Sequence, residues 1–194
     1  PRCGASGRDL QRAGAQPPRR APTVRDLMRH TSGLAYPTEI ADPAVRAAWA
    51  KGGVGPGSSG QTAADFLSRL TRVPLAAEPG ARFQYGYSTD VLGCIVEQLD
   101  GMPLAQSLQR RLFDPLGMQH TGFDAVDGEA TPLAHAEDTA WHAMVPPIGR
   151  RQPGQPRMDS GGGGLISTLD DYLAFARLLA GGGVAGGRRL LSER

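Results

Sequence analysis

Residues 79–101 read PGARFQYGYSTDVLGCIVEQLDG. From residue 91 onward the apolar side chains recur at the spacing of one helix face, and Gly101 is a typical stop signal. We therefore predict a buried helix over residues 89–100, with Ser88 as its N-cap. Two tyrosines, Tyr85 and Tyr87, stand immediately before this helix. This tyrosine-containing segment and its helix are the most informative part of the chain.

Capping signals and apolar spacing predict the other elements. Thr23 with Asp26, and Thr62 with Asp65, each match a capping box at the start of a helix. Proline and glycine punctuation predicts further helices at 43–51, 103–114 and 168–180. The last of these carries Tyr172, Phe175, Ala176 and Leu179. Short strands are predicted around 133–138 and at 165–167, and residues 1–22, rich in Pro, Gly and Arg, are predicted to be an irregular tail.

The composition suits one globular domain and argues against several functions. The chain has 194 residues, 40% of them hydrophobic, and its 21 basic and 19 acidic residues give a net charge of +2. The two signs are interspersed, so nucleic-acid binding is not predicted. No apolar run approaches the ~20 residues of a membrane-spanning helix. The four histidines and two cysteines lack metal-ligand spacing, so neither a metal nor a cofactor is expected.

Four segments in the same order resemble the β-lactamase-related serine hydrolases, which include class C β-lactamases, penicillin-binding-protein-like peptidases and family VIII esterases. The segments are 23–34, 79–101, 113–118 and 160–168 with the following Asp171-Tyr172 pair. The resemblance implies an α/β (α+β) fold, in which an antiparallel sheet flanked by helices stands beside a mostly helical domain. The chain resembles the helical part with only part of the sheet. Residues 23–194 are therefore expected to form a partial domain of this family.

The resemblance also suggests site residues. Anchored on the segment 88–93, it places the family's general base at Tyr85, with Gly86 where serine is usual. Tyr87 is the fallback for the base and a candidate substrate-binding residue. The β-lactamase version of the motif has asparagine two residues after the tyrosine, so Tyr87 at that position favours ester substrates. His30 is expected to be a hydrogen-bonded structural residue of the same family pattern.

The nucleophile of the family is absent from this chain. These enzymes use a serine followed three residues later by a lysine, whereas the only lysine here is Lys51 and position 48 is Ala48. We expect the serine and lysine to lie before Pro1 and a third family motif to lie beyond Arg194, so that the chain alone is inactive.

The expected function is a serine hydrolase that cleaves a small-molecule ester or amide through an acyl-enzyme. A non-catalytic scaffold or binding protein derived from the same fold is the alternative. The start at Pro1 suggests that upstream sequence is missing, and no signal-peptide pattern is visible. A cytoplasmic location is slightly favoured, and the oligomeric state stays open.

Overall fold

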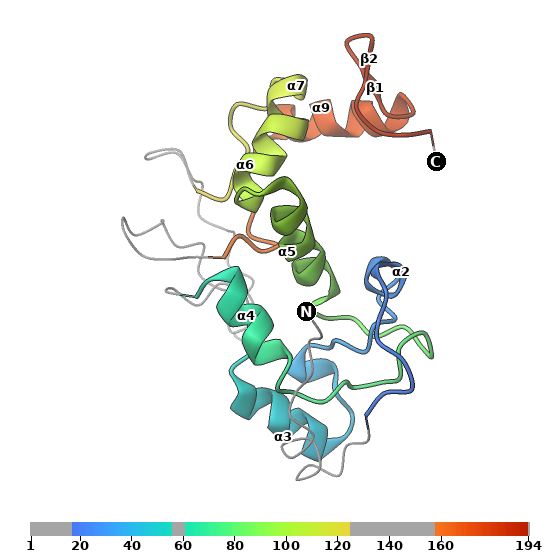
Figure 1. The fold of residues 1–194 in the computed structure, drawn as a ribbon. Coiled ribbons are helices and arrows are strands. Elements are labelled where there is room, and N and C mark those ends of the chain that lie inside the picture. Colours follow the sequence, from blue (N-terminus) through green and yellow to red (C-terminus); the bar gives the residue numbers. More distant parts are fainter. Residues whose placement is uncertain (1–16, 56–60, 125–157, 194) are drawn as a thin grey trace, which may run out of the picture. The chain divides into compact units, whose positions relative to one another are not determined.

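The computed structural model describes residues 17–55, 61–124 and 158–193, and Figure 1 shows their fold. This part of the chain is mostly helical and contains a two-stranded antiparallel sheet, as expected for the helical part of an α/β (α+β) fold. The chain divides into two compact units, Pro1–Gln98 with Gly154–Gly162 and Leu99–Pro153 with Gly163–Arg194. The strand predicted around 133–138 lies outside the described residues. None of the described helices is long and apolar enough to cross a membrane.

Helices of the first unit begin where the sequence places their N-terminal signals. In chain order the elements are α2 (Val24–Met28), the 3-10 helix η1 (Pro37–Glu39), α3 (Pro43–Gly52), α4 (Ala63–Leu70) and α5 (Ser88–Asp100), which belongs to this unit as far as Gln98. Thr23 and Thr62 each accept a hydrogen bond from the backbone of the aspartate three residues on, and each aspartate accepts one in return. Both predicted capping boxes are confirmed.

The first unit has a hydrophobic core built on aromatic side chains. Trp49 of α3 and Phe66 of α4 are fully buried, and the Trp49 indole donates a hydrogen bond to the Pro74 carbonyl at 2.8 Å. The Tyr87 ring stacks nearly parallel to Trp49, with ring centroids 5.9 Å apart. The other buried core residues are Leu27, Leu34, Ala35, Ile40, Val54, Leu70, Val73, Cys94 and Met158. One of the two motif tyrosines is thus part of the core.

Helix α5 exists, but it begins at Ser88, so Ser88 lies inside the helix and is not the predicted N-cap, and its hydroxyl bonds Ser32 instead. The buried face of α5 also differs from the prediction. The buried positions are Ser88, Asp90, Gly93 and Cys94. The apolar side chains of the predicted stripe are only partly buried, and Leu99 is 80% exposed. The small residues are buried because another backbone segment passes close to the helix: a Cβ added to Gly161 would lie 2.2 Å from the Thr89 carbonyl oxygen. The spacing of apolar residues predicts the helix, but it gives no sign that the backbone at Gly161 packs against it.

The second unit contains short helical pieces and a hairpin. Its elements are α6 (Leu104–Leu108), the π-helix η2 (Gln109–Phe113), α7 (Asp114–Leu116), α9 (Leu169–Ala180), β1 (Val184–Ala185) and β2 (Arg188–Arg189). The helix predicted at 103–114 continues to Leu116, because Pro115 lies in the first turn of α7, where a missing N–H costs nothing. Gly117, with φ of 69°, then ends it.

The C-terminal part of this unit departs from the predictions in detail. The strand predicted at 165–167 is a single antiparallel bridge between Gly122 and Ile166. Helix α9 begins at the predicted Thr168 cap, but it buries Asp171 and Leu178 and leaves Tyr172 62% exposed. The β1–β2 hairpin was not predicted. Its turn residues Gly186 and Gly187 both have positive φ, as a two-residue hairpin turn requires.

Candidate active site

The segment Phe83–Tyr87 lies in the first unit and presents its aromatic residues on different sides. Phe83 is 66% exposed and Tyr85 is 50% exposed, whereas Gln84, Gly86 and Tyr87 are buried. Backbone hydrogen bonds fix the segment: the Gln84 N–H donates to the His30 carbonyl at 2.7 Å, and the Tyr36 N–H donates to the Tyr85 carbonyl at 3.3 Å. The loop between α2 and η1 therefore holds the two tyrosines in place.

Tyr85, the residue expected to be the general base, lies between two other rings. The His30 imidazole stacks on it with centroids 5.1 Å apart and an interplanar angle of 29°. The Tyr36 ring meets it edge-on at 5.4 Å and 81°. Among the described residues, no side chain or backbone group hydrogen-bonds the Tyr85 hydroxyl. A half-exposed phenol whose hydroxyl is not bonded by any described residue can still meet a substrate or a nucleophile.

Tyr87 has the surroundings of a core residue. It is 6% exposed, and its hydroxyl donates a hydrogen bond to the Val54 carbonyl at 3.0 Å. Phe66 and Tyr36 pack edge-on against its ring at 5.9 and 4.6 Å. Burial, together with the neighbouring Tyr36 and Asp90, raises the pKa of Tyr87 to about 12. A satisfied hydroxyl that resists ionisation favours a packing role over the fallback role as base and over substrate binding.

The start of α5 is held by buried polar contacts that the sequence did not reveal. The hydroxyls of Ser88 and Ser32 are 2.8 Å apart and both residues are fully buried. The Asp90 carboxylate, also fully buried, accepts a hydrogen bond from the Ser160 hydroxyl. Burial raises the pKa of Asp90, although the bonds from Ser160 and the Gly162 backbone oppose the shift. The Ser32 and Ser160 hydroxyls are thus both engaged in hydrogen bonds within this unit.

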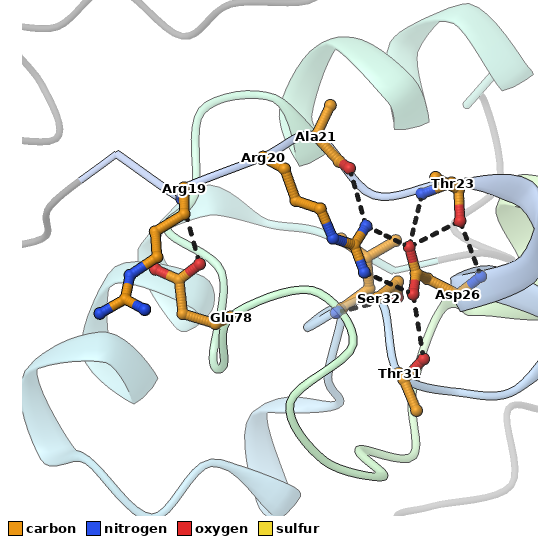
Figure 2. Close-up of polar contacts among 9 residues, drawn as sticks. Arg19, Arg20, Ala21, Thr23, Asp26, Thr31, Ser32 and Glu78 are labelled. Carbon is orange, nitrogen blue, oxygen red and sulfur yellow. Dashed lines mark hydrogen bonds and ion pairs between the residues drawn. The ribbon is translucent and has the colours of Figure 1, made fainter.

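A second carboxylate anchors the loop beneath the tyrosines. Figure 2 shows Asp26 at the centre of a hydrogen-bond network that reaches Arg20, Thr23 and Thr31. The Arg20 guanidinium binds both carboxylate oxygens, at 2.6 and 2.9 Å, and with the Thr23 bonds it holds the pKa of Asp26 well below its usual range. Arg20 thereby fixes part of the predicted irregular tail against α2.

The residues brought together do not form a complete hydrolytic centre. The chain contains no serine with a lysine three residues later. Within 17–55, 61–124 and 158–193, no group of three or more His, Cys, Asp and Glu side chains is arranged to hold a metal ion. Sequence reasoning placed the base on an accessible tyrosine and missed its contact with His30. Both residues lie in segments matched to the family, but spacing alone does not pair them.

The chain belongs to the Beta-lactamase family, whose model matches residues 10–194. Among curated proteins, it is 40% identical over 180 residues to Protein Rv1367c of Mycobacterium tuberculosis, covering 91% of this chain and 43% of that protein. It is 30% identical over 182 residues to Esterase EstB of Burkholderia gladioli, covering 78% of this chain and 42% of the esterase. The chain therefore spans less than half the length of these relatives.

Solved structures give the same picture. The chain superposes on EstCE1, described as a hydrolase with promiscuous acyltransferase activity, with a TM-score of 0.67 at 26% identity. That match covers 98% of this chain and 51% of EstCE1. The expected family and the expected α-dominated part of its fold are confirmed.

Proposed function

We propose that the complete protein carrying this chain is a serine hydrolase that cleaves esters through an acyl-enzyme, with Tyr85 as its general base. The observation that carries the proposal is the position of Tyr85: an accessible phenol at the family's tyrosine position, clamped between two rings. The esterase relatives support a hydrolase, and the hydrolase with acyltransferase activity supports an acyl intermediate.

The chemistry assigns one proton transfer to this chain. A serine hydroxyl is a weak nucleophile until a base accepts its proton, and the Tyr85 oxygen is suited to that role. The serine oxygen then bonds to the ester carbonyl carbon, the alcohol leaves with a proton, and water cleaves the resulting acyl-enzyme. A phenol ordinarily titrates near pH 10, so it acts as a base near neutral pH only beside a cation. The family's lysine supplies that charge, and it would come from sequence outside these 194 residues.

Esters are favoured over β-lactams as the substrate class. The β-lactamase version of the motif, as the resemblance gives it, has an asparagine two residues after the tyrosine. Here that position holds Tyr87, which is buried and bonded to Val54. Two relatives are named esterases, EstB and the lovastatin esterase of Penicillium rubens, the latter 30% identical over 174 residues. Amides remain the second substrate class of the proposal.

Replacing Tyr85 with phenylalanine in the complete protein tests the base. We expect kcat for p-nitrophenyl acetate and butyrate to fall by about 10²–10⁴, the usual contribution of a general base. Tyr172→Phe, at a tyrosine exposed on α9, is the matched control and leaves kcat unchanged.

Unchanged ester turnover in Tyr85→Phe would show that the base is another residue. A folded complete protein with no turnover of esters or amides would instead support the non-catalytic scaffold.

A further inference from the structure

His30 has a backbone conformation that histidine rarely adopts. Its φ is +52°, and no other non-glycine residue in the described part of the chain has a positive φ. Neighbouring backbone bonds impose this conformation: the His30 N–H donates to the Leu27 carbonyl at 3.1 Å, and its carbonyl accepts from the Gln84 N–H at 2.7 Å. Strained conformations persist where the surrounding structure over-determines them, and they concentrate at functional sites.

The side chain of His30 also lacks the bonds expected of a structural histidine. Its Nδ1 atom is buried and has no hydrogen-bond partner among the residues that the structure describes. The hydrogen bond expected of this histidine is therefore not made at Nδ1. The ring instead makes aromatic contacts, stacking on Tyr85 at 5.1 Å and tilting against Phe83 at 5.7 Å. Glycine and asparagine adopt this left-handed backbone more readily, so a substitution by asparagine removes the ring without opposing the backbone conformation.

The network around Asp26 holds Thr31, the residue that follows His30. Thr31 donates from its backbone to the Asp26 carbonyl at 2.8 Å and from its hydroxyl to the Asp26 carboxylate at 3.3 Å. Arg20 locks that carboxylate with two bonds, as Figure 2 shows. The imidazole is therefore attached to a rigid support, whereas the Tyr85 ring on which it stacks is half exposed.

We propose that His30 is a positioning residue for Tyr85: its strained, rigidly supported imidazole fixes the phenol ring against Tyr36, so that the hydroxyl points where a nucleophile would lie. The inference rests on the proposed function of Tyr85. Catalytic groups must be held close to their productive geometry, and an exposed phenol with free ring rotation loses that precision. His30 touches the base and takes no proton in this role.

Two substitutions in the complete protein separate positioning from stability. His30→Asn removes the ring but suits the left-handed backbone, so the Tm is expected to hold while kcat for p-nitrophenyl butyrate falls about 100-fold. The KM is expected to change less than about twofold, since substrate binding is not altered. His30→Phe keeps a stacking ring in a less tolerant backbone, so it lowers the Tm while retaining kcat within about tenfold of the wild type.

A merely structural histidine would give the reverse pattern, in which kcat follows the Tm and the asparagine variant stays active. Either that result or a kcat in His30→Asn equal to the wild type overturns the inference. Tyr85→Phe, measured in parallel, keeps the two proposals apart. If Tyr85→Phe abolishes turnover and His30→Asn does not, only the positioning role is wrong; if Tyr85→Phe is fully active, the assignment of the base is wrong.

Discussion

At the scale of single residues, the packing around Gly86 explains why position 86 of this motif is glycine. The family usually has serine at this position, but here the backbone of Leu34 and Ala35 passes directly over it. A Cβ added to Gly86 would lie 2.4 Å from the Ala35 Cα atom and 2.5 Å from the Leu34 carbonyl oxygen. No flexible side chain is available to move aside, because the contacts are with backbone. The segment around Gly86 can therefore pack this closely against Leu34 and Ala35 only because glycine has no Cβ.

Gly86→Ala should accordingly destabilise the protein although it adds only one carbon. Since backbone must shift to admit the Cβ, we expect a loss of about 3 kcal/mol or more in the free energy of unfolding. Denaturant unfolding followed by circular dichroism measures it. Gly55→Ala is the matched control, as its added Cβ would meet nothing closer than the Tyr87 hydroxyl at 3.8 Å, and it should change stability by less than about 0.5 kcal/mol. Equal losses in the two variants would contradict the close approach.

At the scale of elements, α5 combines a helix with a buried polar anchor. Asp90 is fully buried in its first turn and accepts a bond from Ser160, while its second oxygen, Oδ2, has no hydrogen-bond partner among the described residues. A Cβ added to Gly162 would lie 2.9 Å from that oxygen. The glycine-rich loop thus packs directly on the carboxylate. A buried carboxylate with an unsatisfied oxygen is more stable as the neutral acid.

Asp90→Asn should therefore change how stability depends on pH. Burial raises the folded-state pKa of Asp90 above its ordinary 3.8, so its contribution to stability is fully present below that value. The contribution is lost as the pH rises through the folded-state pKa, whereas asparagine stays neutral throughout. We expect the Tm of the variant to gain on the wild type by roughly 2 °C or more between pH 4 and pH 8, measured by calorimetry.

The exposed Asp170 on α9 provides the control for this measurement. Asp170→Asn removes an exposed carboxylate and is measured over the same pH range, so that the comparison isolates the effect of burying Asp90. The prediction is contradicted if the Tm of Asp90→Asn, relative to the wild type, stays constant or falls as the pH rises. That result would mean that the folded protein does not disfavour the charged carboxylate.

The elements also show what the sequence could predict about the fold. Helix starts such as Thr23 and Thr62 were found because a cap depends on residues three positions apart. Burial depends on contacts between distant segments, which is why α5 buries Asp90 instead of Leu99 and why α9 exposes Tyr172. The β1–β2 hairpin was missed because its strands are two residues each, too short for an alternating pattern.

For the candidate site, too, the sequence predicts some features and not others. The motif that suggests Tyr85 lies in one continuous stretch, so the sequence alone leads to this residue as the candidate base, and the structure adds that it is half exposed. The contact with His30 joins residues 55 positions apart and gives no periodic signal. Tyr87 is buried because its ring packs against Trp49 of α3 and Phe66 of α4. No rule of spacing distinguishes the accessible tyrosine from the buried one.

At the scale of the whole molecule, the chain matches only part of the length of its relatives. It spans 43% of Protein Rv1367c and 51% of EstCE1, so much of each relative lies outside the matched part. The described residues include a half-exposed phenol, Tyr85, in contact with the rings of His30 and Tyr36. Serine hydrolysis also needs an activated hydroxyl and a cation, and the sole lysine, Lys51, follows Ala48 by three positions. The proposed chemistry therefore depends on residues that these 194 do not include.

A fluorophosphonate probe, which bonds through phosphorus to an activated serine oxygen and loses fluoride, tests this division of the site. The 194-residue chain should show no mass increase with the probe, because removing a nucleophilic serine and its partners costs about a millionfold in turnover. The complete protein should gain one adduct, mapped by peptide mass spectrometry to a serine followed three residues later by lysine. Circular dichroism of the chain alone provides the check that its helices are formed. An adduct on a serine within residues 1–194 would mean that a hydrolytic centre is assembled from other side chains, and an unlabelled but folded complete protein would favour a scaffold that has lost its chemistry.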